Sequence, residues 1–117
     1  KNEKKVMVWG SGKPKREFLH TDDLAEACFF LMKNYNSFEI INAGTGEDIT
    51  IKDLAEKIKK IVGYEGKIAW DKTKPDGTPR KLLDVSKINK IGWKSKIGLE
   101  DGIKMTYEWY LNNINKI

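Results

Sequence analysis

The 117-residue chain is poor in the residues that would mark a disulfide-rich or zinc-binding protein. It holds one cysteine, Cys28, one histidine, His20, and three prolines. A single cysteine excludes a disulfide framework within the chain and a zinc site built from cysteines. No apolar run approaches the ~18 residues of a transmembrane helix, and the mean hydropathy is −0.59. We therefore expect no membrane partner, and the lone thiol fits the reducing cytoplasm.

Arginine is also scarce. Of the 22 basic residues only Arg16 and Arg80 are arginine, and 17 acidic residues leave a net charge of +5. The positive charge is concentrated in residues 1–20 (net +4) and 67–96 (net +6). Both arginines lie in Gly/Pro-bearing segments, where binding groups are commonly presented, and arginine can bind phosphate through two parallel hydrogen bonds. The two segments could converge on one anion site or be ordinary solvated surface.

Two familiar phosphate-binding motifs fail in this chain. The segment Gly10–Lys13 lacks both the earlier glycine and the following Ser or Thr of a P-loop. Neither glycine pair, at 10 and 12 or at 44 and 46, is followed by the third glycine of a dinucleotide fingerprint. We interpret His20 as a residue that packs or hydrogen-bonds beside a helix start, and Cys28 as a core residue on an apolar helix face.

The periodicity predicts alternating strands and helices. The expected elements are a strand at 6–9, a helix opened by Thr21, a strand at 38–42, a helix from Thr50 to Gly63, a strand at 67–70, a loop at 71–81, and helices at 86–91 and from Leu99 onward. Few strands are available to flank the apolar run at 38–42, so the sheet looks incomplete. Because the chain also begins with Lys1 rather than methionine, we expect it to be one domain, residues 1–117, of a longer protein.

Three stretches carry a family resemblance: VWGSGKPKREFLHTDDLAEA at 8–27, INAGTGEDITIKDLAEKI at 41–58 and KPDGTPRKLLDVSKI at 74–88. They resemble the C-terminal part of the GDP-L-fucose synthases, which belong to the extended short-chain dehydrogenase/reductases. The KPDGTPRKLLD stretch is the most characteristic of that branch. The resemblance implies an α/β fold, α+β in isolation: a small mixed sheet with three to four helices, the N-terminal Rossmann domain being absent.

The resemblance also implies a function. The complete enzyme would invert C3 and C5 of GDP-4-keto-6-deoxy-mannose and reduce its C4 ketone with NADPH. The NADP(H) site and the catalytic residues would belong to the missing Rossmann domain, so the 117 residues alone are expected to be inactive. A homodimer is expected for the complete enzyme.

By position, the resemblance implies substrate-binding roles for five residues. Trp9 would lie along the nucleotide-sugar, Arg16 would pair with the diphosphate, and Asp76 would bind the nucleotide portion. Lys81, with Arg80 beside it, would lie near phosphate. Asp76 in a Pro-Asp-Gly sequence is equally a good turn residue without any ligand.

Two alternatives stay open at this point. The chain could be the substrate domain of another nucleotide-sugar epimerase or dehydratase. It could also be a basic, non-enzymatic module that binds nucleic acid, which the net charge of +5 and the four tryptophans permit. The sequence contains no groove-reading helix or aromatic RNA-binding motif, so nucleic acid is not the expected partner.

Overall fold

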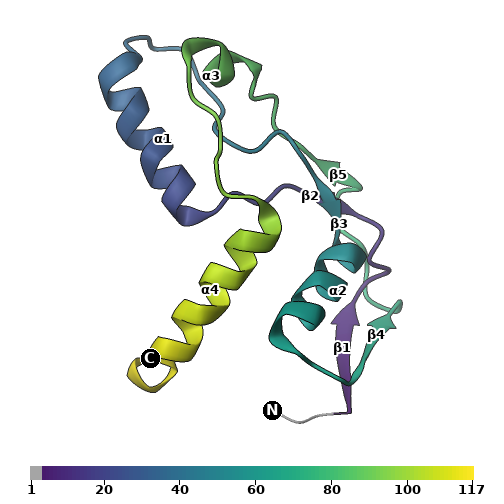
Figure 1. Ribbon diagram of the computed structural model, residues 1–117. Coiled ribbons are helices and arrows are strands. Elements are labelled where there is room, and N and C mark those ends of the chain that lie inside the picture. Colours follow the sequence, from purple (N-terminus) through teal and green to yellow (C-terminus); the bar gives the residue numbers. More distant parts are fainter. Residues whose placement is uncertain (1–3) are drawn as a thin grey trace.

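A computed structural model describes residues 4–117 (Figure 1). In chain order its elements are β1 (Lys5–Trp9), β2 (Lys15–Arg16), α1 (Thr21–Asn34), β3 (Ile49–Thr50), α2 (Ile51–Val62), β4 (Lys67–Asp71), β5 (Arg80–Lys81), α3 (Ser86–Ile91), α4 (Leu99–Asn113) and the 3₁₀ helix η1 (Ile114–Lys116). The longer elements match the sequence prediction. The short strands β2, β3 and β5 lie where loops or no strand were expected.

The ends of α2 follow from local chemistry. The Thr50 hydroxyl accepts a hydrogen bond from the Asp53 backbone N–H at 3.1 Å, which satisfies a donor that the first helical turn leaves unpaired. Gly63 ends the helix with φ +73°, a left-handed conformation that glycine adopts without steric cost. The sequence predicts both the start of this helix at Thr50 and its end at Gly63, and both predictions are confirmed.

The start of α1 differs by one residue from the prediction. The N-cap is His20, whose Nδ1 accepts from the Asp22 backbone N–H at 3.0 Å, and Thr21 is the first helical residue. The imidazole nitrogen replaces the hydroxyl oxygen expected at the cap. His20 is therefore used as a hydrogen-bonding residue beside the helix start, as interpreted from the sequence.

The strands form two small sheets. β1 pairs with β4 in parallel, and β2 lies between antiparallel β3 and parallel β5. With the four α-helices of residues 4–117, this confirms the predicted α/β architecture of mixed sheet and three to four helices, although the strands form two small sheets rather than one. The second sheet matters most for the site, because its parallel pair joins segments far apart in the sequence.

The shape is elongated rather than closed around one core. The radius of gyration is 17.0 Å, against roughly 13 Å for a compact chain of this length. At one end α1 and α3 enclose a small apolar cluster, and at the other α2 packs against α4 (Figure 1). Within residues 4–117, no helix combines the length and apolar character required to cross a membrane. The cluster consists of Ala27, Val85, Ile88 and Trp93, with Leu19, Phe30, Leu31, Ile41 and Ala43 packed around it.

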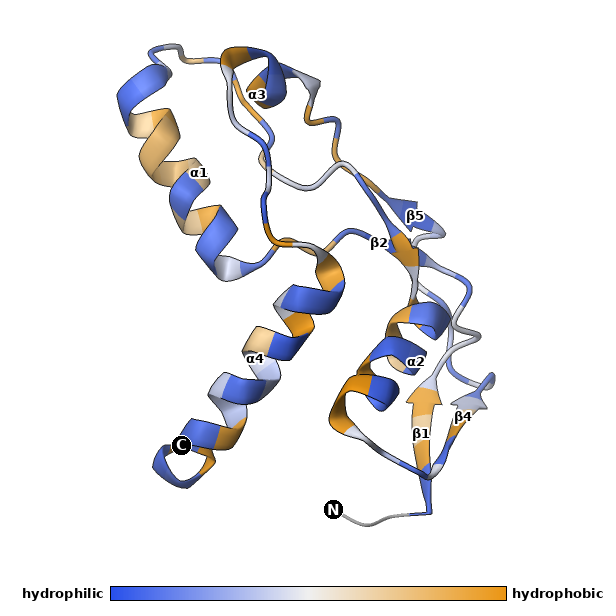
Figure 2. Cartoon of the chain, viewed as in Figure 1, coloured by the Kyte–Doolittle hydropathy of each residue, from blue (hydrophilic) through white to orange (hydrophobic). Residues whose placement is uncertain are grey.

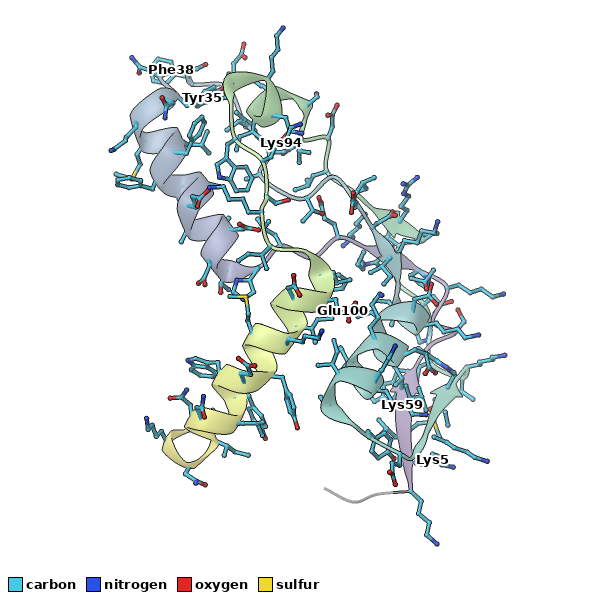
Figure 3. The ribbon with its side chains drawn as sticks, viewed as in Figure 1. Lys5, Tyr35, Phe38, Lys59, Lys94 and Glu100 are labelled. Atoms are coloured by element: carbon cyan, nitrogen blue, oxygen red, sulfur yellow. The ribbon has the colours of Figure 1, made fainter. Side chains whose placement is uncertain are left out.

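Two predictions about the core are wrong for this structure. Cys28 is exposed, as are Leu24 and Met32 on the same helix, because the structure packs only the other side of α1. Residues 38–42 are irregular rather than a strand, and the side chain of Phe38 is fully exposed (Figure 3). A strand needs a hydrogen-bonded neighbour, and no strand of the described residues pairs with this run.

Candidate functional site

The two basic loops singled out in the sequence lie side by side. β2 and β5 pair so that Lys15 is opposite Arg80 and Arg16 is opposite Lys81. The Lys15 backbone N–H donates to the Pro79 carbonyl at 2.9 Å. Residues 65 positions apart in the chain thus form one short ladder. The structure therefore joins the two basic segments into one positively charged strip.

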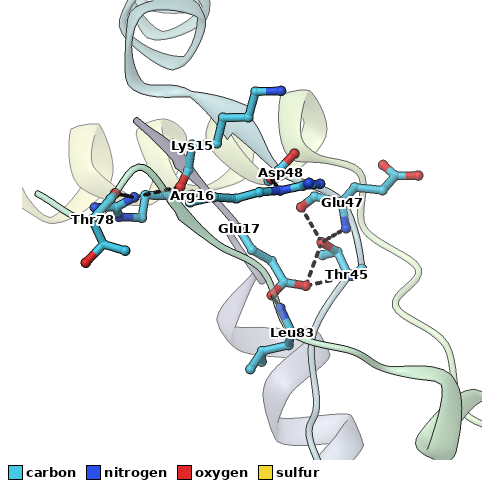
Figure 4. Close-up of polar contacts among 10 residues, drawn as sticks. Lys15, Arg16, Glu17, Thr45, Glu47, Asp48, Thr78 and Leu83 are labelled. Carbon is cyan, nitrogen blue, oxygen red and sulfur yellow. Dashed lines mark hydrogen bonds and ion pairs between the residues drawn. The ribbon is translucent and has the colours of Figure 1, made fainter. Parts of the chain in front are cut away.

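Arg16 connects this strip to the loop before β5 (Figure 4). Its Nη1 donates to the Lys15 carbonyl at 2.7 Å and to the Thr78 carbonyl at 2.6 Å. Its Nη2 lies so close to Gly77 that a Cβ there would come within 2.9 Å. The guanidinium thus braces the 77–79 loop and places its positive charge beside Gly77 and Thr78.

Arg80 is held from the opposite side of the strip. Its Nε donates to Asp48 Oδ2 at 2.6 Å, and the Asp48 side chain is only 11% exposed. A charge-assisted hydrogen bond of this length orients the guanidinium strongly. Lys81 follows with an exposed side chain. The strip thus presents one oriented arginine and one exposed lysine.

Trp9 lies at the end of β1 with 71% of its surface exposed. The ammonium of Lys74 lies 4.9 Å from the centroid of its ring, a cation–π geometry. An exposed indole beside a lysine offers both an aromatic face and a positive charge. Trp9 ends the strand that precedes the Arg16 segment, and Lys74 lies in the same loop as Asp76.

Asp76 links its loop between β4 and β5 to the turn after β1 through hydrogen bonds from Ser11. Its Oδ1 accepts from the Ser11 backbone N–H at 2.8 Å, and its Oδ2 accepts from the Ser11 hydroxyl at 2.6 Å. A Cβ on Gly10 would come within 2.6 Å of Oδ1, and Gly10 has φ +95°, so only glycine suits this approach. Asp76 therefore has a structural use, and its contact with a nucleotide stays a prediction.

The hydrogen bonds from Ser11 lower the pKa of Asp76 below its usual 3.8, with the hydroxyl the larger cause and the backbone N–H the next. We expect an NMR titration to show Asp76 ionising below 3.8, and Ser11→Ala to raise the value toward 3.8. Lys13→Ala, which removes only a more distant charge, should change it little. A depressed pKa means that the ionised form stabilises the fold above pH 3.8 and that this contribution is lost as pH falls through the folded value. An unchanged Asp76 pKa in Ser11→Ala would contradict this account.

Glu17 was not among the predicted site residues. Its Oε2 accepts from the Gly46 backbone N–H at 2.6 Å and from the Thr45 hydroxyl at 3.3 Å, and its Oε1 accepts from the Leu83 backbone N–H at 3.1 Å (Figure 4). One carboxylate thus connects three segments. The residue lies inside the REFLH motif, directly after Arg16, and this position was the only sequence signal for it.

Two cavities lie next to the strip rather than within it. One, of about 460 Å³, is lined by Phe18, Thr45, Glu47, Asp48, Ile49, Lys57 and residues 95–99. The other, of about 490 Å³, is mainly apolar and is lined by residues of α2 and α4, and Figure 2 shows hydrophobic residues on both helices. Neither is lined by Trp9, Arg16 or Asp76. The predicted residues share a surface, and the described part of the chain leaves that surface open.

Comparison with known proteins finds one matching family model and several similar GDP-L-fucose synthases. Residues 1–44 match the NAD dependent epimerase/dehydratase family. The chain is 57% identical to GDP-L-fucose synthase 1 of Arabidopsis thaliana, over 93% of this chain and 34% of that protein. It is 49% identical to the GDP-L-fucose synthase of Escherichia coli K12, over 92% of this chain and 36% of that protein.

The fold of the chain is also similar to that of solved structures. A GDP-L-fucose synthetase from Naegleria fowleri, bound to NADP, superposes with a TM-score of 0.89 at 31% identity, covering 95% of this chain and 36% of that one. The chain thus spans about a third of the length of the relatives that it matches. The matching third is their C-terminal part.

Proposed function

We propose that the chain is the GDP-sugar-binding part of an extended short-chain dehydrogenase/reductase of the GDP-L-fucose synthase type, because its sequence and fold are similar to the C-terminal part of such enzymes. The substrate would be GDP-4-keto-6-deoxy-mannose. The observation that carries the proposal is the β2–β5 pairing, which puts Arg16 next to Lys81 and Lys15 next to Arg80. Successive residues of a strand point to opposite faces, so each pair of cations lies on its own face of the two strands. The Arg16–Lys81 pair suits a diphosphate, whose negative charge requires several donors.

The role of this part is to hold the nucleotide while the sugar reacts elsewhere. Binding energy from a non-reacting group orients the reacting ring and lowers the entropic barrier. Trp9 supplies an aromatic face for the nucleotide-sugar, and Arg16, Arg80 and Lys81 supply charge for the diphosphate. The Trp9 and Arg16 loops are tied to the 76–79 turn by hydrogen bonds from Ser11 and Arg16, so the donors are ordered before substrate arrives.

NADP(H) is the cofactor of the proposed enzyme, but this chain does not fit its site. Neither glycine pair continues into a dinucleotide fingerprint. The Gly10 turn is instead filled by the Asp76 carboxylate, which accepts from the Ser11 backbone N–H. We assign NADP(H) binding and the chemical steps to an N-terminal Rossmann domain, and expect the 117 residues alone to be inactive.

The exposed apolar residues of α1 and the segment after it support such a domain as partner. Phe29, Met32, Phe38 and Ile40 are all largely exposed, and contiguous apolar surface of this kind commonly marks a protein contact. A partner strand alongside residues 38–42 would also supply the hydrogen bonds that this segment lacks for a strand. The complete enzyme is proposed to be a cytoplasmic homodimer.

Substrate profiling of the complete enzyme tests the proposal. We expect NADPH-dependent conversion of GDP-4-keto-6-deoxy-mannose, and little conversion of the corresponding UDP- or dTDP-sugars. The isolated chain should not oxidise NADPH in the presence of the same substrate. Preference for UDP- or dTDP-sugars would instead favour a related epimerase or dehydratase. Salt-sensitive binding to DNA or RNA without binding to GDP-sugars would favour a nucleic-acid module.

A further inference from the structure

We propose that Glu17 is a positioning residue that sets the geometry of the phosphate-binding cations, an inference that rests on the proposed GDP-sugar function. Its carboxylate does not face the ligand as a binding group. It acts by tying together three segments: β2 with Arg16, the segment after β5, which carries Arg80 and Lys81, and the loop that leads to Asp48. Loss of this tie should weaken GDP-sugar binding while the chemical step continues.

The contacts of Glu17 reach each of these segments. Glu17 directly follows Arg16 at the end of β2. Its Oε1 accepts from the N–H of Leu83, two residues after Lys81. Its Oε2 accepts from the N–H of Gly46, in the loop that leads to Asp48. The partners lie 29 and 66 residues away along the sequence. This carboxylate therefore sets the spacing of segments that are distant from one another along the chain.

Asp48 extends the same arrangement to Arg80. Glu17 holds the backbone of Gly46, and two residues later the Asp48 carboxylate accepts from Arg80 Nε at 2.6 Å. Displacement of the Gly46 loop would therefore displace the carboxylate that orients Arg80. Lys81 and Arg80 thus depend on the Glu17 carboxylate by different routes, through Leu83 and through Asp48, and Arg16 directly precedes Glu17 in the chain.

The chemistry requires a carboxylate at this position. Two backbone N–H groups point at the two oxygens, and an ionised carboxylate is an acceptor on both. Glutamine offers one oxygen and one NH₂ group, so one backbone donor would face another donor. Glycine at position 44 leaves room for this carboxylate, because a Cβ there would lie 2.6 Å from Glu17 Oε2.

The test uses the complete enzyme with Glu17→Gln. We expect KM for the GDP-sugar to rise roughly tenfold, with kcat and KM for NADPH changed less than about twofold. The matched control is Glu47→Gln, the same change on an exposed side chain of the neighbouring loop. It should leave KM for both substrates unchanged.

A second variant reaches the same contact from the other side. Gly44→Ala should push the Glu17 carboxylate away from Gly46 and raise KM for the GDP-sugar in the same way. If both variants act through one contact, their effects on KM should be non-additive in the double variant. Additive effects would overturn the proposed route. Gly44→Ala also serves as the test if Glu17→Gln does not fold.

The outcomes separate this inference from the proposed function. If Arg16→Ala raises KM for the GDP-sugar and Glu17→Gln does no more than Glu47→Gln, the positioning role is wrong and the proposed function stands. If neither Arg16→Ala nor Glu17→Gln changes this KM, the proposed function falls. Equal losses in kcat and in both KM values in Glu17→Gln would indicate a general structural role and would also overturn the inference.

Discussion

Replacing Arg16 with alanine in the complete enzyme is expected to raise KM for the GDP-sugar roughly 10- to 100-fold, with a much smaller change in kcat. The guanidinium is proposed to contact the diphosphate in the ground state and in the transition state alike. Removing such uniform binding raises KM and spares kcat. The loss of its bond to the Thr78 carbonyl also loosens the loop before Arg80 and Lys81, which adds to the effect.

Steady-state kinetics with varied GDP-sugar at saturating NADPH would measure this. Arg16→Lys should fall between wild type and alanine, because lysine keeps the charge but loses the planar fork of donors. Lys94→Ala provides a charge-matched control, since Lys94 is exposed and follows α3, away from the β2–β5 strip (Figure 3). A KM for Arg16→Ala equal to that of Lys94→Ala would remove the main support for a diphosphate site here.

The largest loss of stability is expected for Trp93→Ala, which should lower the free energy of unfolding by about 3–5 kcal/mol. Trp93 is 3% exposed and packs in the cluster with Ala27, Val85 and Ile88. Its indole N–H donates to Glu26 Oε1 at 3.2 Å, which fixes the ring against α1. Truncation removes apolar contact, opens a cavity and breaks this hydrogen bond together.

Urea unfolding of the chain, followed by circular dichroism, would provide the measurement. Trp109→Ala is the matched control, because Trp109 is 58% exposed on α4 and its truncation should cost less than about 1 kcal/mol. Trp93→Phe should be intermediate, because it keeps part of the buried area and loses the N–H. Equal effects of the two alanine variants would show that the α1–α3 cluster is not the stabilising core.

Helix positions could be predicted because their signals are local. The N-cap at Thr50, the left-handed Gly63 and Gly92, and the apolar spacing of α2 and α4 all act within a few residues. The interpretation of His20 as a hydrogen-bonding residue next to a helix start was correct for the same reason, although it took the capping position predicted for Thr21.

Burial could not be predicted in the same way. The periodicity of α1 places Leu24, Ala27 and Cys28 on one apolar face, but the structure buries only Ala27 of these. The apolar run at 38–42 has strand composition and no strand partner among the described residues. An apolar pattern specifies that a surface should be covered, while the neighbours present in space decide whether it is.

The sequence alone determined the order of the helices, the position of the two longer strands and the identity of the charged residues. Caps, turns and periodicity are properties of neighbouring residues. The pairing of β2 with β5, the closure of Ser11 onto Asp76 and the three contacts of Glu17 were decided only by the tertiary structure. Each of these joins groups that lie 28 or more positions apart. A side chain's hydrogen-bonding capacity can be read from its type, but its partner depends on how distant segments pack.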